Sequence, residues 1–178
     1  HTQMLSNGFG MREWQSVGLT GLANGHTFMG GFYKSGVLAP GADDPVLPPA
    51  AGRDAAVALF DVTDQTAVAK GVDGIEAGLG PIDILVNNAG MQFRTALEDF
   101  PADKWQQLLQ TNISSVFFTG QAVARHMIKR GCGKIINIAS VQSHLARPTT
   151  APYTATKGAV KNLTMGMCTD WAKYGLNI

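Results

Sequence analysis

Three side chains that can hold or move a proton lie within eighteen residues of one another. Ser140 follows the apolar run of residues 134–139, and Tyr153 and Lys157 follow it, four positions apart. On a helix, residues four apart share one face, so the phenol and the ammonium would lie side by side. A nearby ammonium favours the phenolate form of a phenol. Tyr153 could then give and take a proton while Ser140 holds a substrate oxygen.

The neighbouring residues predict the elements that would position these three. Residues 134–139 are apolar, short and rich in β-branched side chains, which predicts a buried strand. Tyr153 begins a segment with helical spacing, whose apolar side is Val160, Leu163, Met167 and Trp171. Ser140 would lie at the carboxyl end of its strand, where open α/β sheets bind ligands. We therefore expect the three side chains to converge at one edge of a sheet.

Two earlier strands are also expected to end at polar or small residues. Residues 57–60 predict a buried strand that ends at Asp61, and Thr63 or Asp64 could cap the helix that follows. Residues 82–86 predict a second strand, which ends at Asn87-Asn88-Ala89-Gly90. Strands that alternate with helices predict a parallel sheet with right-handed crossovers.

A long helix is expected after Phe100-Pro101, and it carries one unusual residue. Its apolar stripe is Trp105, Leu108, Leu109, Val116, Phe117, Val123 and Met127. Asn112 is polar among these apolar neighbours and is either a surface or capping residue or part of a site. His126, on the same helix, is expected to be solvated.

The chain resembles the short-chain dehydrogenase/reductase family through an ordered set of residues: Asp61, Asn87-Asn88-Ala89-Gly90, Asn112, Ser140, Tyr153 and Lys157. The resemblance implies a Rossmann-like doubly wound parallel sheet with helices on both faces, here incomplete. It implies NADP or NAD as cofactor and a catalytic set of Asn112, Ser140, Tyr153 and Lys157, in which Asn112 holds a water that relays protons from Lys157. It also implies cofactor contacts from Asp61 and Val62 to adenine, and from Asn88, Ala89, Gly90, Tyr153 and Lys157 to the ribose side.

A subgroup that interconverts an alcohol and a ketone on a sugar acid, such as gluconate, is similar in residues 60–64, 121–128 and 151–161. The resemblance implies a sugar-acid substrate and a homotetramer assembled through two long helices. Arg94 follows Gly90 by four positions and could clamp a carboxylate with two parallel hydrogen bonds. Alternatively, it is an ordinary solvated loop arginine. Ser140 and Tyr153 would complete the substrate contacts.

Residues 1–56 match the family pattern poorly and residues 57–178 match it well, within one domain. Residues 17–27 resemble a glycine-rich phosphate turn that leads into a helix, with Gly21 and Gly25 in the turn and Thr27 where a last glycine belongs. Threonine adds a β-branched side chain there, and the alternative is that no phosphate site exists. Family members continue beyond Ile178. The resemblance implies an NAD(P)-dependent oxidoreductase. The alternatives are that this chain is an inactive fragment or a non-catalytic nucleotide-binding relative.

The composition argues against several other classes of protein. The chain has 178 residues, of which 45% are hydrophobic and 15% are charged, which suits one domain with a buried core. A net charge of +1 without a basic run argues against nucleic-acid and membrane-surface partners. Cys132 and Cys168 are too few and too far apart for a metal site or a disulfide framework, which favours a reduced, cytoplasmic protein.

Overall fold

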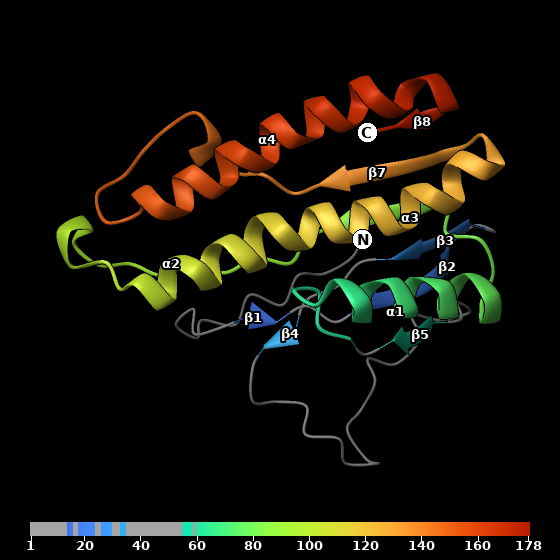
Figure 1. The fold of residues 1–178 in the computed structure, drawn as a ribbon, viewed down its shortest axis with the longest axis horizontal. Coiled ribbons are helices and arrows are strands. Elements are labelled where there is room, and N and C mark those ends of the chain that lie inside the picture. The colour runs from blue at the N-terminus through green and yellow to red at the C-terminus, as the bar shows by residue number, and fades with distance from the viewer. Residues whose placement is uncertain (1–13, 16–17, 24–25, 30–32, 35–54, 59) are drawn as a thin grey trace, which may run out of the picture.

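The computed structural model describes residues 14–15, 18–23, 26–29, 33–34, 55–58 and 60–178 (Figure 1). The strands are β1 (Trp14–Gln15), β2 (Gly18–Ala23), β3 (His26–Met29), β4 (Tyr33–Lys34), β5 (Ala55–Ala58), β6 (Ile84–Asn87), β7 (Gly133–Asn137) and β8 (Leu176–Asn177). The α-helices are α1 (Gln65–Gly78), α2 (Ala102–Leu109), α3 (Ser115–Arg130) and α4 (Ala151–Trp171). Short helical turns are η1 (Leu97–Asp99), η2 (Gln110–Ser114), η3 (Val141–Ser143) and η4 (Ala172–Tyr174).

The main sheet has the strand order β5-β2-β3-β6-β7-β8, and only part of it is parallel. β3, β6, β7 and β8 pair parallel, with Leu85 of β6 opposite Ile135 of β7. β2 pairs antiparallel with both β3 and β5. The predicted Rossmann-like parallel arrangement is therefore confirmed for the part of the sheet that carries the candidate site, and the other part is a correction to it.

The amino-terminal strands differ from the expected strand, glycine-rich turn and helix. Gly21 lies inside β2, paired with Phe28 of β3 and with Ala55 of β5, so it does not lie in a turn that begins a helix. Gly25 lies outside the described residues. Thr27 belongs to β3, as β-branched residues favour strands. Two strands joined by two residues must run antiparallel, because a parallel connection needs a crossover of roughly a dozen residues or more.

Helix α1 begins where its sequence predicts. The Asp64 carboxylate accepts hydrogen bonds from the backbone N–H groups of Thr66 and Ala67 at 2.8 and 3.0 Å, so Asp64 is the residue that caps the helix. Gly80 has a φ of +114° just beyond the helix, a conformation that favours glycine. The buried side of α1 is Val68, Val72 and Ile75.

The long helix expected after Phe100-Pro101 is continuous but changes its hydrogen-bonding pattern in the middle. α2 and α3 are joined without a break by η2, a π-helical turn that contains Asn112. At its end the Ser115 N–H bonds to the Gln110 carbonyl, five residues back, and not to the usual residue four back. Phe117, expected in the apolar stripe, is 41% exposed, whereas Leu108, Val116, Val123 and Met127 are buried.

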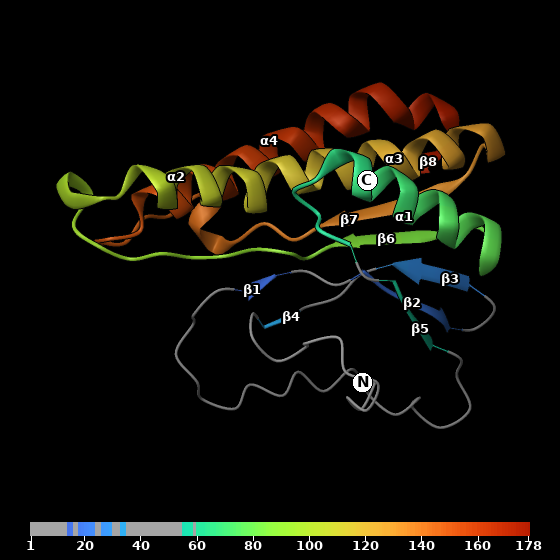
Figure 2. The same ribbon diagram turned by 60° about the horizontal axis from the view of Figure 1, so that its bottom comes forward.

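Helices α1, α3 and α4 lie on one side of strands β6 and β7 (Figures 1 and 2). Leu85 and Ile135 point to that side and pack in a core with residues from α1 and α3, among them Val72, Val123 and Met127. On the opposite side of β7, Ile136 and Ile138 are 47% and 40% exposed. The described elements place no helix over these two isoleucines, although the sequence predicts helices on both faces. No described helix has the length and apolar composition needed to span a membrane.

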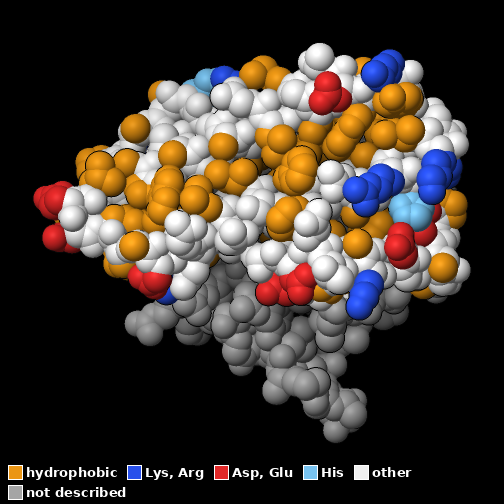
Figure 3. All heavy atoms as spheres, in the orientation of Figure 1, with side chains coloured by type: hydrophobic (Ala, Val, Ile, Leu, Met, Phe, Trp, Pro, Cys, Tyr) orange, Lys and Arg blue, Asp and Glu red, His pale blue; other side chains and the backbone are white. Residues whose placement is uncertain are grey.

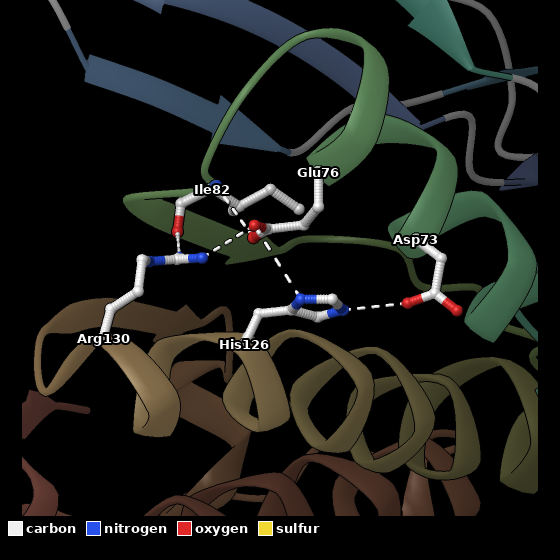
Figure 4. A network of polar contacts seen from close by, with 5 residues as sticks. All are labelled: Asp73, Glu76, Ile82, His126 and Arg130. Atoms are coloured by element: carbon white, nitrogen blue, oxygen red, sulfur yellow. Dashed lines mark hydrogen bonds and ion pairs between the residues drawn. The ribbon is translucent and has the colours of Figure 1, made fainter.

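A polar network fixes α1 and the following loop to the end of α3 (Figure 4). Arg130 donates to the Glu76 carboxylate and to the Ile82 carbonyl, both at 2.7 Å, and the Ile82 N–H donates to Glu76 at 2.9 Å. His126 lies 2.8 Å from Asp73 and 3.9 Å from Glu76. His126 thus keeps part of its surface in water, as expected, and two carboxylates on α1 also face it.

Candidate active site

Tyr153 and Lys157 lie in the first turns of α4, on the same face of the helix. Pro152 stands at the start of the helix, where its missing N–H costs no intrahelical hydrogen bond. The ammonium nitrogen of Lys157 lies 5.8 Å from the centre of the Tyr153 ring. The Tyr153 hydroxyl makes no hydrogen bond within the described part of the chain, and its side chain is half-buried. The phenol is thus held beside a cation and is free to contact a ligand.

Lys157 is a buried cation with most of its hydrogen-bonding capacity unused. It is 5% exposed, and its ammonium donates to the Ile138 carbonyl at 2.7 Å, two residues before Ser140. Burial lowers the pKa of Lys157 below its ordinary value. An ammonium has three N–H donors, and among the described residues only Ile138 accepts from it. Two donors therefore remain available in the site.

Asn112 uses its whole side chain to tie two elements together. Its Oδ1 accepts from the Met91 N–H at 2.8 Å, and its Nδ2 donates to the Met91 carbonyl at 2.9 Å and to Thr156 Oγ1 at 3.0 Å. Thr156 in turn donates to the Tyr153 carbonyl at 2.8 Å. Asn112 and Thr156 are fully buried. The π-helical turn thus joins the segment after Gly90 to the helix of Tyr153 and Lys157.

Ser140 ends the segment after β7 and begins the turn η3. Its backbone is extended, and its hydroxyl oxygen accepts from the Gln142 N–H at 3.2 Å. Because that bond uses an oxygen lone pair, the hydroxyl hydrogen is free to be donated to a ligand. Ser143 donates to the Lys157 carbonyl at 2.9 Å, so the turn that follows Ser140 lies directly against α4.

A second buried network holds the carboxyl ends of β6 and β7 together. Asn87 donates to Asn137 at 2.9 Å and accepts from Thr119 of α3 at 2.6 Å. Asn137 donates to Thr164 of α4 at 3.0 Å. The amides therefore connect two strands with two helices, directly before Asn88 on one strand and close to Ser140 on the other.

The remaining predicted residues lie outside this cluster. Asp61 is exposed and its Oδ1 accepts from the Thr63 N–H and hydroxyl at 2.8 and 2.7 Å, which leaves the second carboxylate oxygen open. The side chain of Val62 is buried in the core and leaves only its backbone for a ligand. Arg94 is exposed in the segment between β6 and η1, without an ion pair to any described residue.

The nicotinamide-ribose end of a dinucleotide fits these residues. A Cβ built on Gly90 would lie 3.6 Å from both Asn112 Oδ1 and Lys157 Nζ, so the backbone at Gly90 lies beside the buried ammonium. The two open donors of Lys157 suit the paired hydroxyls of a ribose. The phosphates of a dinucleotide usually bind at a turn that leads into a helix N-terminus. Gly21 lies in strand β2 and does not form such a turn.

Several residues of the site were not predicted from the sequence. Thr156 bonds to Asn112 and Thr154 bonds to Gln142, which joins elements of the candidate site. Thr119 and Asn137 complete the network at the strand ends. The one available signal is the repeated threonine in Tyr153-Thr154-Ala155-Thr156-Lys157, since threonine in the first turns of a helix often bonds to nearby groups.

The parallel sheet and the residues at its strand ends define a short-chain dehydrogenase. A family model described as short chain dehydrogenase matches residues 47–178, and the chain belongs to this family. The family resemblance predicted from the sequence is thereby confirmed.

The chain is also similar to particular members of the family. It is 65% identical over 129 residues to the gluconate 5-dehydrogenase of Gluconobacter oxydans (strain 621H), covering 72% of this chain and 50% of that protein. It is 46% identical over 127 residues to the 5-keto-D-gluconate 5-reductase of Escherichia coli (strain K12), covering 71% and 50%. A crystal structure of a gluconate 5-dehydrogenase from Burkholderia cenocepacia J2315, in complex with NADP and tartrate, matches with a TM-score of 0.66 at 60% identity, covering 67% of this chain and 47% of that one. The chain thus spans about half the length of the relatives it matches.

Proposed function

We propose that the complete protein is an NADP- or NAD-dependent oxidoreductase that interconverts an alcohol and a ketone on a sugar acid, gluconate and 5-ketogluconate. The observation that carries this proposal is the buried Lys157 ammonium, which lies beside Gly90 and 5.8 Å from the centre of the Tyr153 ring, and which uses one of its three donors among the described residues. Similarity to a gluconate 5-dehydrogenase and a 5-keto-D-gluconate 5-reductase supports the substrate class.

Each residue of the cluster has a role in this proposal. Tyr153 takes the proton of the substrate hydroxyl or returns it, as a general base or acid. Ser140 donates its free hydroxyl hydrogen to the same substrate oxygen and orients it. Lys157 binds the ribose hydroxyls and holds its ammonium beside the ring of Tyr153. Asn112 supports the proton relay from Lys157, and the bound dinucleotide supplies the hydride acceptor or donor.

The dinucleotide would be held by residues from three strand ends. Asn88, Ala89 and Gly90 line the ribose next to Lys157, and Asp61 and the Val62 backbone contact the adenine. The open carboxylate oxygen of Asp61 supports that contact, and the NADP in the relative from Burkholderia cenocepacia supports the choice of cofactor class.

Arg94 is proposed to bind the carboxylate of the sugar acid. It is exposed, unpaired among the described residues and four positions after Gly90, so its guanidinium is available for a bidentate contact. The tartrate in the relative's structure is itself a hydroxylated acid. Tyr153 and Ser140 would contact the reacting hydroxyl at the other end of the substrate.

We further propose a cytoplasmic homotetramer assembled through α3 and α4. Hydrophobic side chains gather in a band across the helical face of the molecule, while charged groups lie mostly toward its edges (Figure 3). Phe117 and Met165 are 41% and 54% exposed on α3 and α4. An apolar cleft between η1, α2 and the start of α4 adds to this face, lined by Leu97, Phe100, Ala102, Trp105, Ala151, Pro152 and Ala155.

Substitution of the phenol tests the proposed chemistry. Tyr153→Phe removes the transferable proton and keeps the ring, so we expect kcat for gluconate oxidation by the complete protein to fall by about 10² to 10⁴. Binding of NADP, followed by fluorescence titration, should change little, since the phenol is not its main anchor. Lys157→Ala should lower both kcat and the affinity for NADP. A kcat close to that of the unaltered enzyme in Tyr153→Phe would remove this residue from the mechanism.

Substitution of Arg94 tests the proposed substrate class. Truncating one partner of a desolvated charge pair costs roughly 2 to 5 kcal/mol, and about 1.4 kcal/mol corresponds to a factor of ten. We therefore expect Arg94→Ala and Arg94→Gln to lower kcat/KM for gluconate by a factor of about thirty or more. A neutral polyol of the same length, which lacks the carboxylate, is the control. Equal losses on both substrates would assign Arg94 a structural role.

A further inference from the structure

The turn after Ser140 is attached to helix α4 by two side-chain hydrogen bonds. Thr154 Oγ1 donates to Gln142 Oε1 at 3.2 Å, and Ser143 Oγ donates to the Lys157 carbonyl at 2.9 Å. Both bonds connect the segment that carries Ser140 with the helix that carries Tyr153 and Lys157. The relative placement of the proposed catalytic groups therefore depends on contacts between η3 and the first turns of α4.

Gln142 takes part in one of these two bonds and also contacts Ser140 directly. Its backbone N–H donates to the Ser140 hydroxyl oxygen at 3.2 Å, and its side chain accepts from Thr154, the residue next to Tyr153. Gln142 is 9% exposed. One buried residue thus contacts the catalytic hydroxyl through its backbone and the catalytic helix through its side chain.

The hydrogen bonding of Gln142 is incomplete, which separates its role from simple stabilisation. Its amide nitrogen has no hydrogen-bond partner in the part of the chain that the structure describes. Leaving a buried donor unpaired offsets much of what one hydrogen bond contributes to stability. The side chain is therefore a weak stabiliser of the fold, although it stands between two catalytic elements.

We propose that Gln142 and Thr154 are positioning residues whose hydrogen bond, the Gln142–Thr154 clasp, sets the distance between the Ser140 hydroxyl and the Tyr153 phenol. This inference rests on the proposed function for the roles of Ser140 and Tyr153. Both groups must contact one substrate oxygen, and a reacting geometry loses rate steeply when it is displaced by about 1 Å. Without the clasp, Ser143 supplies the one remaining side-chain hydrogen bond between η3 and α4 among the described residues, and η3 can shift relative to Tyr153.

The test uses two substitutions that remove the clasp from opposite sides in the complete protein. Gln142→Leu removes the acceptor and Thr154→Val removes the donor, each with little change in volume. Thr154→Ser keeps the hydroxyl. Thr169→Val is the matched control, because Thr169 is also on α4 and, among the described residues, its hydroxyl bonds only to the Met165 carbonyl of the same helix.

We expect each of the two substitutions to lower kcat by roughly tenfold or more, while KM for the dinucleotide stays within about twofold, because Lys157 and Gly90 are not moved. The double variant should be no slower than the slower single variant, since both remove the same bond. Thr154→Ser should restore most of the rate, and Thr169→Val should leave it unchanged. The melting temperature of Gln142→Leu should not fall. The substitution removes the hydrogen bond to Thr154, but it also removes the buried amide N–H group of Gln142 that has no partner among the described residues. Unchanged kcat in either single variant, or losses that multiply in the double variant, would overturn the clasp.

Amide hydrogen exchange tests the Gln142–Thr154 clasp in the absence of substrate. The N–H groups of Ser143 and His144 bond to the Ser140 and Val141 carbonyls within η3. These two N–H groups should exchange faster in Gln142→Leu and in Thr154→Val, and at the original rate in Thr169→Val. Unchanged exchange in Gln142→Leu and Thr154→Val would overturn the clasp. Failure of the unaltered enzyme to turn over gluconate would refute the proposed substrate instead, and the exchange result would still stand.

Discussion

The unusual residue of the site is Lys157, a cation that the fold removes from water. Its hydrogen bond to the Ile138 carbonyl compensates for only part of the hydration that it loses. Burial lowers its pKa, so the folded state binds this proton less tightly than the unfolded chain does. Stability rises with pH wherever the unfolded state holds more protons. Lys157 therefore costs stability near neutral pH, and the cost fades as the pH approaches the ordinary lysine value of 10.5.

We expect Lys157→Met in the complete protein to be at least as stable as the original near neutral pH, although it should lose activity. A methionine fills a similar volume without a charge to desolvate, and replacing a buried charge by an apolar group is often neutral or stabilising. The difference in unfolding free energy between the two proteins should shrink as the pH is raised toward the ordinary lysine pKa. Urea titrations at a series of pH values measure this difference. A variant that is clearly less stable at neutral pH would show that Lys157 is a net stabiliser.

At this scale the sequence predicted the local pairs and missed the distant ones. The spacing of Tyr153 and Lys157 was enough to place them on one face of a helix, and the ring and ammonium are 5.8 Å apart. The bonds from Asn112 to Met91 and Thr156 span 21 and 44 residues. Such pairs depend on how whole elements pack, and one sequence does not encode that packing in any local pattern.

At the scale of elements, two glycines of similar appearance in the sequence have opposite effects in the structure. Gly175 joins η4 to β8 with a φ of +79°, and a Cβ there would collide with the Gly131 carbonyl. Gly74 lies on the exposed side of α1 with nothing within 4 Å of an added Cβ. Position 175 therefore requires glycine. At position 74 a glycine brings no packing advantage and only the entropic cost of glycine in a helix.

We expect Gly175→Ala to destabilise the protein by more than about 1 kcal/mol, since left-handed backbone alone costs about 1–2 kcal/mol for other residues. Gly74→Ala should stabilise it by roughly 0.5–1 kcal/mol. Thermal and urea unfolding of the two variants side by side measure both effects. A Gly175→Ala variant as stable as Gly74→Ala would mean that the turn before β8 is not formed as described.

Element type was predictable wherever capping and periodicity agree, as in α1 from Asp64 to Gly80. Charged residues gave less information. No sequence pattern predicted that Asp73, Glu76, His126 and Arg130 form the network between α1 and α3 (Figure 4). The strand β2 was missed because a glycine-rich segment predicts a turn, and the two-residue link to β3 then forces antiparallel pairing.

At the scale of the whole molecule, the face of the sheet opposite the helices determines how the 178 residues behave alone. Ile136 in β7 and Ile138 directly after this strand are 47% and 40% exposed. Apolar side chains in contiguous exposed patches favour association. The chain spans about half the length of its relatives, whose remaining residues are available to cover such a face.

We expect the 178 residues, expressed alone, to self-associate and to show little or no dehydrogenase activity with gluconate. Replacing both Ile136 and Ile138 by threonine keeps a β-branched shape and should reduce the association measured by light scattering. In the complete protein the same double substitution should instead lower stability, if further residues cover these positions. A monodisperse, fully active 178-residue protein would contradict this expectation.

The π-helical turn between α2 and α3 has a consequence for how this chain tolerates deletions. Removing one residue from Gln110–Ser114 would restore regular helical hydrogen bonding, and the backbone would lose a rarely used conformation. Since each residue of an α-helix turns by about 100°, everything before the deletion would rotate by that angle relative to α3. Leu108 would leave its buried position, and Asn112 could no longer face Met91 and Thr156 at once. The deletion would therefore make the helix more regular but disrupt both the core at Leu108 and the contacts of Asn112.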